Sequence, residues 1–221
     1  EVYQFVVEEL TEVIPDLQES SGEDMHGRFN KWAGKALLAN IYLNAEVYSG
    51  EAAWNKCIEQ CNDIINSGNY ALEENYDDFT GKNTLGSSEM IFGLQFDEIR
   101  APWVLIRASW HDGARPKWKA GANFYGAGSL KAVPQFIDTY DTTDLRLYDT
   151  WAMGLQLTPE GDTCTGNYEK AGKPLIFTKE MKDGEYTAEN AGYRFAKFDL
   201  YQGMMSGGPG MTTTFPIFRY A

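Results

Sequence analysis

The amino-acid sequence predicts a mostly α-helical fold in which a tetratricopeptide-like helical hairpin supports long irregular loops and a few short β-strands. Three observations predict it: consecutive helical patterns joined by a Ser-Gly break, short apolar runs bounded by turn residues, and a long aromatic-rich stretch without periodicity. The chain has 221 residues, enough to bury a sizeable core. We expect a single domain, with a helical scaffold at residues 1–70 and a loop-rich, ligand-facing part at residues 71–221.

The scaffold contains three predicted helices. Residues 1–14 place apolar side chains on one helical face, and Pro15 ends that pattern. Residues 27–48 carry the strongest pattern, and residues 51–66 follow with a clean apolar face. Two antiparallel helices joined by a tight turn form a repeat unit that must stack on neighbours. We therefore expect this chain to be a piece of a longer protein.

Several side chains of these helices are predicted to lie in the core because of their helical spacing. Trp32 and Trp54 belong to this group. Cys57 and Cys61 are four residues apart, so both should lie on one helix face as small apolar residues. Three cysteines and two histidines offer no recognisable zinc quartet, so we expect no metal centre and no cofactor.

The remaining elements are short. Apolar runs bounded by turn residues predict strands at residues 89–96, 147–158 and 175–178, and an extended segment at residues 192–198. Pro134 marks the first turn of a short helix at residues 133–140. Residues 141–146 are polar and are predicted to form a turn. Residues 206–210 are glycine-rich and predict a flexible loop without the Lys-Ser/Thr of a phosphate loop.

Composition excludes some functions. The net charge of −13 repels phosphate backbones, so nucleic acid is not expected as a partner. Carboxylates occur in pairs, as at Asp77 and Asp78 or Asp141 and Asp144. No sequence feature identifies one of them as a general acid, so we expect that the protein is not an enzyme. Asp97 and Glu98 could bind a structural calcium ion, although a solvated strand end is favoured.

Five motifs resemble those of the RagB/SusD family, and they follow one another along the chain in the same order. They are residues 27–45, which include Ala-Gly-Lys-Ala-Leu-Leu-Ala-Asn-Ile-Tyr, residues 65–70 (Ile-Asn-Ser-Gly-Asn-Tyr), residues 88–92 (Ser-Glu-Met-Ile-Phe), residues 141–146 (Asp-Thr-Thr-Asp-Leu-Arg), and residues 215–221. The last motif looks like the beginning of the family's Pro-x-x-Arg-Tyr-Ala helix.

This resemblance implies a non-catalytic, glycan-binding lipoprotein on the outer membrane of a Bacteroidetes-type cell. Such a protein binds oligosaccharide or polysaccharide for nutrient uptake and covers a SusC-like TonB-dependent transporter. It is held at the extracellular face through a lipidated N-terminus that is absent from this chain. The family implies a helical tetratricopeptide-repeat scaffold, and its variable loops carry the specificity for the ligand.

Sugar binding needs flat aromatic faces for pyranose rings and polar groups at their edges. Residues 99–128 contain both kinds without sustained periodicity, and loops of this length are usually functional. The candidate glycan-binding residues are Trp103, Trp110, Trp118, Tyr125, Arg107, Asp112 and Asn123. The alternative for each tryptophan is that it anchors the loop on the scaffold, and Trp151 is open to either role.

Two other functions stay open at this level. A helical-repeat scaffold also suits a peptide- or protein-binding module of the same transporter system. A hydrolase is the third possibility, and it would require a pair of carboxylates with separated pKa values.

Overall fold

The computed structural model describes residues 1–75, 86–96, 109–110, 112–118, 128, 130–167, 171–182, 184, 188–198 and 214–221. Contacts divide the chain into two compact units. The first unit is Glu1–Phe79, Asn83–Gln95 and Thr214–Ala221, and the second is Thr80–Lys82 and Phe96–Thr213. The first unit thus holds residues from both sides of the division expected at residue 70. The expectation of a single domain stays a prediction.

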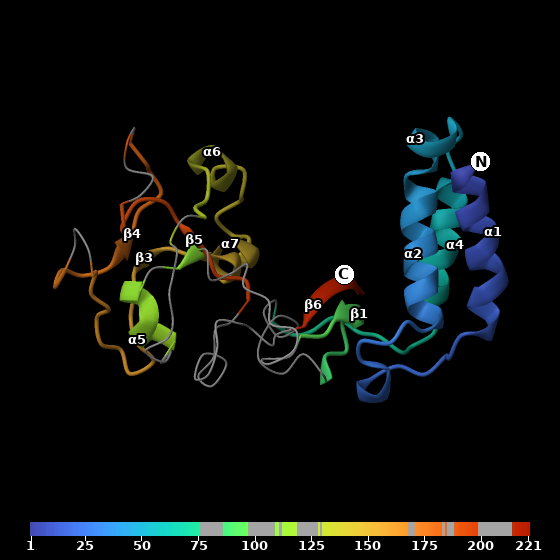
Figure 1. Ribbon diagram of the computed structural model, residues 1–221, viewed down its shortest axis with the longest axis horizontal. Helices are drawn as coiled ribbons and strands as arrows, with labels where there is room; N and C mark the ends of the chain where they lie inside the picture. Colours follow the sequence, from blue (N-terminus) through green and yellow to red (C-terminus); the bar gives the residue numbers. More distant parts are fainter. Residues whose placement is uncertain are drawn as a thin grey trace. The chain divides into compact units, whose positions relative to one another are not determined.

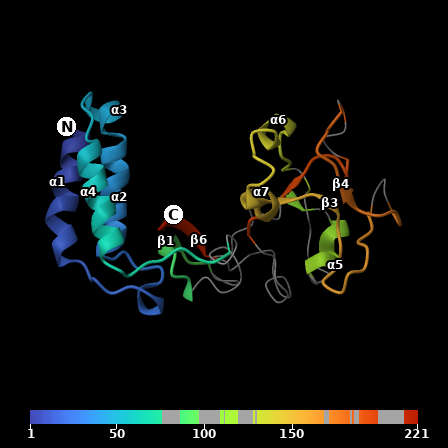
Figure 2. The ribbon, with the colours of Figure 1, turned by 180° about the vertical axis from the view of Figure 1, so that it is seen from behind.

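In its described residues, the first unit consists of helices and one strand pair (Figure 1). Its elements are α1 (Val2–Val13), η1 (Ile14–Asp16), η2 (Glu23–Met25), α2 (Lys31–Leu43), α3 (Ala45–Ser49), α4 (Trp54–Asn66), β1 (Met90–Leu94) and β6 (Phe215–Arg219). Helices α1, α2 and α4 lie side by side, as Figures 1 and 2 show from opposite directions. One core cluster joins α2 and α4 to β1 through Trp32, Ala33, Ile64 and Ile91.

The helix expected at residues 27–48 is shorter and interrupted. It begins at Lys31 because Asn30 caps it: the Asn30 side chain accepts a hydrogen bond from the Ala33 N–H at 2.9 Å. It ends at Leu43, where Asn44 leaves the helical conformation, and α3 follows as a separate turn. The other helices, expected at residues 1–14 and 51–66, are confirmed as α1 and α4 with small shifts of their ends.

The C-terminal motif forms a strand, so the helix expected to begin there is wrong. Phe215–Arg219 pairs antiparallel with β1, and Met90 lies opposite Arg219 and Leu94 opposite Phe215. Backbone groups of β1, the strand correctly expected within residues 89–96, are thereby satisfied by a segment more than a hundred residues later. Local sequence does not reveal such a pairing.

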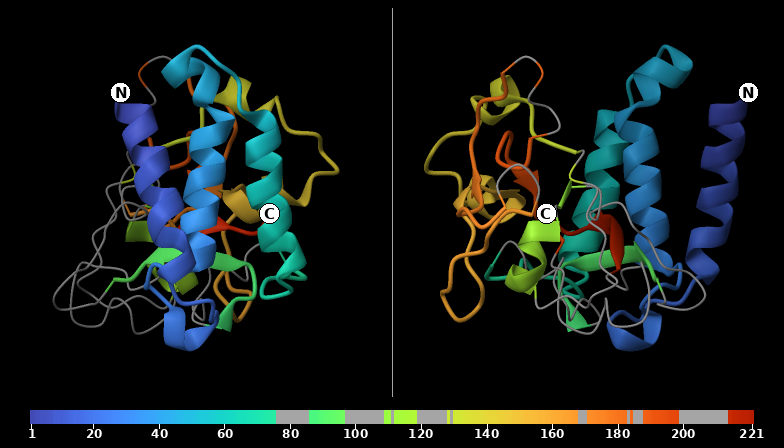
Figure 3. Two further views of the ribbon diagram at one scale, coloured as in Figure 1. Left: turned by 90° about the vertical axis from the view of Figure 1, so that its right-hand side faces the viewer. Right: turned by 60° about the vertical axis from the view of Figure 1, so that its left-hand side comes forward.

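The second unit is built from short elements joined by loops. They are η5 (Asp112–Ala114), α5 (Arg115–Trp118), α6 (Pro134–Ile137), α7 (Leu145–Thr150), β2 (Trp151–Ala152), β3 (Gly154–Leu155), β4 (Ile176–Phe177) and β5 (Arg194–Phe195). β2 pairs with β5 and β3 with β4, both antiparallel. The right-hand view of Figure 3 shows these elements as short coils and arrows joined by loops.

Part of the strand expected at residues 147–158 is helical. Asp144 caps α7 by accepting a hydrogen bond from the Arg146 N–H at 2.9 Å, so residues 145–150 form a helix before β2 begins. Within the expected range, Trp151–Ala152 and Gly154–Leu155 form the short strands β2 and β3. The short helix with Pro134 and the extended runs around residues 176 and 194 are confirmed as α6, β4 and β5.

Among the described residues, no helix combines the length and the apolar character that a bilayer span needs.

Candidate functional site

Trp110 is the one predicted site residue whose side chain is described, and it is completely buried. Its ring centroid lies 6.0 Å from that of Phe177 in an edge-to-face arrangement. Trp110 therefore presents no face to a ligand: it is a core residue of the second unit, packed against Phe177. For Asp112 and Trp118 the structure describes the backbone only, in η5 and α5. Trp103, Arg107, Asn123 and Tyr125 lie outside the described residues.

A buried arginine completes this core. The Arg194 guanidinium carbon lies 5.1 Å from the centroid of the Phe177 ring, and the group donates to the carbonyl oxygens of Gly128 at 3.2 Å and Glu189 at 2.9 Å. Burial lowers the pKa of Arg194 to about 10, so it remains charged at neutral pH. This cation orders three segments of the second unit and has no access to solvent.

A different group of aromatic side chains reaches the surface of the second unit. We define the aromatic ladder as Phe136, Tyr140, Trp151, Phe195 and Phe198. Successive contacts are edge-to-face, with centroids 5.6 Å apart for Phe136 and Tyr140, 6.2 Å for Phe136 and Trp151, and 5.8 Å for Trp151 and Phe195. Phe136 is 50% exposed, Tyr140 and Trp151 are half-buried, and Phe198 closes the ladder in the interior.

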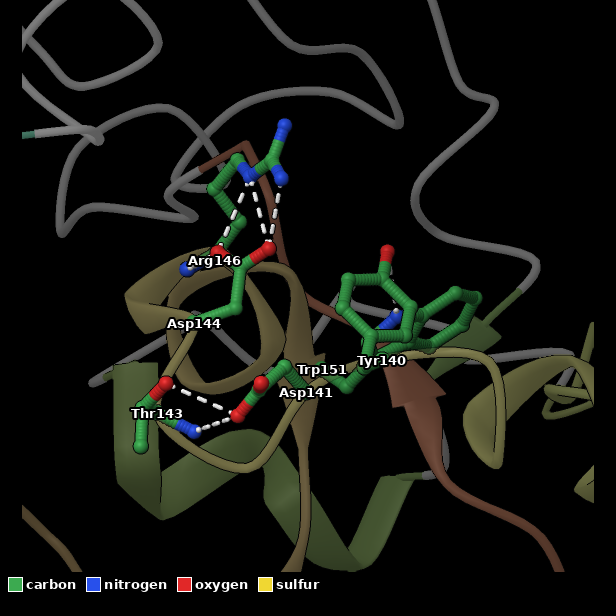
Figure 4. Close-up of polar contacts among 6 residues, drawn as sticks. All are labelled: Tyr140, Asp141, Thr143, Asp144, Arg146 and Trp151. Atoms are coloured by element: carbon green, nitrogen blue, oxygen red, sulfur yellow. Dashed lines mark hydrogen bonds and ion pairs between the residues drawn. The ribbon is translucent and has the colours of Figure 1, made fainter.

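The secondary structure explains how the ladder forms. Phe136 and Tyr140 are four residues apart on and just after α6, so they share one side of that turn. Trp151 opens β2 directly after α7, and its strand partner is Phe195 in β5. The Trp151 indole N–H donates to the Tyr140 hydroxyl at 3.4 Å, which links the two side chains (Figure 4).

Polar side chains follow Tyr140 of the ladder directly along the chain, in the motif of residues 141–146. Asp141 accepts from the N–H and the hydroxyl of Thr143, both at 2.8 Å, and Asp144 binds the Arg146 guanidinium through two oxygens (Figure 4). The Tyr148 hydroxyl donates to the Thr142 carbonyl at 2.9 Å. Arg146 and Tyr148 are exposed, and we call Asp141, Asp144, Arg146 and Tyr148 the polar rim.

The electrostatics of the rim favour binding over acid catalysis. Hydrogen bonds from Thr143 lower the pKa of Asp141, and the hydrogen bond from Arg146 lowers that of Asp144. Both carboxylates are therefore ionised at neutral pH and serve as hydrogen-bond acceptors. A glycosidase needs one carboxyl group with a raised pKa as its general acid, and this pair does not supply it.

Metal binding finds no support in the described part of the chain, where no cluster of at least three potential ligands occurs. Asp97 and Glu98, named above for calcium, lie outside the described residues, as do Asp77 and Asp78. The ladder itself was missed from the sequence, apart from the open question about Trp151. The available signal was the four-residue spacing of Phe136 and Tyr140 beside a polar turn.

Comparisons with known proteins agree with the motifs. No family model matches the chain. Starch-binding protein SusD of Bacteroides thetaiotaomicron is 31% identical over 104 residues, which cover 45% of this chain and 18% of that protein. A SusD superfamily protein from Parabacteroides distasonis has a similar structure, with a TM-score of 0.63, 21% identity, and coverage of 96% of this chain and 41% of the other.

Surface glycan-binding protein A from Bacteroides thetaiotaomicron, in complex with laminarihexaose, gives a TM-score of 0.65 at 18% identity, with coverage of 99% of this chain and 47% of the other. The chain therefore spans less than half the length of these solved structures, and the matched part of it covers 18% of the curated relative. The family resemblance predicted from the motifs is confirmed: this chain has the SusD-like fold, over part of the length of such proteins.

Proposed function

We propose that this chain is part of a cell-surface protein that binds an oligosaccharide or polysaccharide without chemically changing it. The aromatic ladder, with its exposed Phe136 and its ionised polar rim, carries the proposal. Flat rings accept the C–H faces of pyranoses, while Arg146 and the carboxylates bind hydroxyl groups. The names of similar proteins support the ligand class, since they mention starch, laminarihexaose and a xylogluco-oligosaccharide.

The predicted residues of the aromatic-rich loop extend this proposal. Trp103, Arg107, Asp112, Trp118, Asn123 and Tyr125 would add further ring faces and hydroxyl partners to the ligand site. Trp110 is left out of the binding set because it is buried.

The cellular context is also a proposal. We propose that the protein is lipid-anchored at the extracellular face of the outer membrane and delivers its glycan to a SusC-like TonB-dependent transporter. The antiparallel pair α2 and α4, packed through Trp32, Ala33 and Ile64, supports a tetratricopeptide-like scaffold for that assembly.

Calorimetric titration with a panel of gluco- and xylogluco-oligosaccharides tests the ligand site. Loss of one aromatic contact lowers the binding free energy by about 0.5–1.5 kcal/mol, in addition to the contribution of the buried area. Trp151→Ala and Phe136→Ala should therefore each weaken binding about ten-fold. Arg146→Gln changes an exposed rim side chain and should weaken binding without affecting the fold. Circular dichroism confirms folding for each variant.

Leu155→Ala is the matched control, because Leu155 is an exposed apolar residue of the same unit outside the ladder. If the ladder and rim variants bind as tightly as Leu155→Ala, the ligand site is elsewhere. If the folded wild-type chain binds no member of the panel, the proposed function itself is wrong. Release of reducing sugar would contradict the non-catalytic part of it.

Peptide binding is the second candidate, and one observation favours it. A groove of about 490 Å³ in the first unit is lined mainly by apolar side chains. Its residues are Glu1, Val2, Tyr3, Val6, Ile41, Val47 and Tyr48. Such a surface can hold the apolar side of a peptide. Selection from a peptide library against a glycan array separates the two functions: the first proposal expects hits on the glycan array alone.

A further inference from the structure

A pocket of about 520 Å³ lies in the first unit, where α3 turns into α4. Figure 1 shows α3 and the N-terminal end of α1 at the same end of the three helices. Tyr3 of α1 lines it together with the turn after α3 and the first residues of α4. The lining residues are Tyr3, Ser49, Glu51, Ala52, Ala53, Trp54, Asn55 and Lys56. The volume falls in the range of small-molecule sites, about 300–1,000 Å³.

Trp54 is the side chain that makes this pocket unusual. The helical spacing predicted it to be in the core, but it is 58% exposed, whereas Trp32 is 8% exposed. It is the first residue of α4, ahead of Ile64, the buried residue of that helix. An indole exposed in a pocket offers a large, rigid apolar face that loses little entropy on binding, and Tyr3 adds a second aromatic ring.

The polar lining complements these rings. Glu51, Asn55 and Lys56 are exposed and provide an acceptor, an amide and a donor. The Lys56 ammonium also lies 5.6 Å from the centroid of the Tyr42 ring. One acidic and one basic side chain cancel in charge, so the pocket suits neutral hydroxyl groups better than a charged ligand.

We propose that this pocket is a second carbohydrate subsite, in which a neutral pyranose ring stacks on Trp54 and its hydroxyl groups bind Glu51, Asn55 and Lys56. The ligand class rests on the proposed function, but the site does not, because its residues belong to the other unit. A protein with two such subsites binds two short oligosaccharides at once.

Titration of the full chain with a neutral oligosaccharide that binds the wild type tests the subsite through stoichiometry. The wild type should bind two equivalents. Trp54→Ala should bind one and keep the ladder site, whereas Phe136→Ala should lose affinity at the other site. Trp54→Phe keeps a flat ring and should retain two equivalents, with affinity at the pocket reduced several-fold.

Ile58→Ala is the matched control: Ile58 lies one turn further along α4, is 55% exposed, and does not line the pocket. It should bind two equivalents like the wild type. If the wild type binds a single equivalent and Trp54→Ala does not change its binding, the subsite is wrong while the proposed function stands. If the wild type binds no oligosaccharide of the panel, the subsite and the proposed function are both wrong.

Discussion

Two tryptophans of this chain show how different one residue type can be in its role. Trp110 comes from a stretch without periodicity and is completely buried against Phe177, while Trp54 has helical spacing and is exposed. Helical spacing says which residues share a face, but the face must also meet a partner. Trp54 lies in the first turn of α4, whereas the buried residue of this helix, Ile64, lies near its C-terminal end.

Replacement of Trp110 should destabilise the second unit. Trp110→Ala removes a fully buried indole and leaves a cavity beside Phe177, so the free energy of unfolding should fall by about 3–5 kcal/mol. Urea denaturation measures this change. Leu145→Ala, which shortens an exposed side chain of the same unit, should change it by about 0.5 kcal/mol or less. Equal midpoints for the two variants would contradict the buried position of Trp110.

His26 should make the first unit sensitive to acid. Its Nε2 atom lies 2.8 Å from the Thr214 hydroxyl, and burial lowers its pKa below the usual 6.5. The unfolded chain therefore binds the proton more tightly. The stabilisation that the folded state gains from neutral His26 is fully present above pH 6.5. It is lost as the pH falls through the lowered pKa of the folded state.

Unfolding midpoints measured across this pH range test the role of His26. His26→Gln removes the titrating group, so the part of the slope just below pH 6.5 should flatten in that variant. A slope identical in wild type and His26→Gln would show that other groups cause the dependence.

At the level of elements, short polar side chains set the helix ends. Asn30 caps α2, and its amide also donates to the Ser20 carbonyl at 3.0 Å and to the Tyr70 hydroxyl at 3.2 Å. Asp144 caps α7 and also binds the side chain of Arg146 in the polar rim. The cap of α7 therefore also positions a residue of the proposed ligand site, because one carboxylate serves both purposes.

The β1–β6 pair tolerates no side chain at Gly93. A Cβ atom there would lie 2.5 Å from the Thr214 methyl carbon and 3.1 Å from the Phe215 carbonyl oxygen. Gly93→Ala should therefore separate the strands and lower the unfolding free energy by about 1–3 kcal/mol. Gly86→Ala adds the same atom in open space and should be close to neutral. Thermal unfolding of both variants checks this difference.

At the scale of the whole molecule, the net charge of −13 dominates long-range electrostatics. Neutral glycans carry no charge for this field to act on, whereas polyanionic glycans are repelled. Raising the ionic strength from about 0.01 M to about 1 M shortens the Debye length from about 30 Å to about 3 Å. Affinity for a neutral oligosaccharide should stay nearly constant, and any affinity for an acidic one should rise; titration in both salts measures this. A neutral ligand whose binding collapses in salt would contradict stacking as the main contribution.

The helical part of the fold and its family resemblance could be predicted from the sequence alone. Periodicity, the Ser-Gly break and the motif order are local properties of the chain, and they correctly predicted α1, α4, β1 and the SusD-like fold. Composition, loop length and the family resemblance point to residues 99–128, but they do not distinguish a ring that binds ligand from one that is buried, as Trp110 is.

Tertiary structure alone decided the strand at residues 215–219 and the surface formed by Phe136, Tyr140 and Trp151. The strand forms because it pairs with β1, which is distant in sequence. The ladder forms because side chains from α6 and β2 meet. Periodicity and capping act over a few residues and are readable in the chain. Strand pairing and the exposure of an aromatic ring depend on which segments meet after folding, and no local pattern records that.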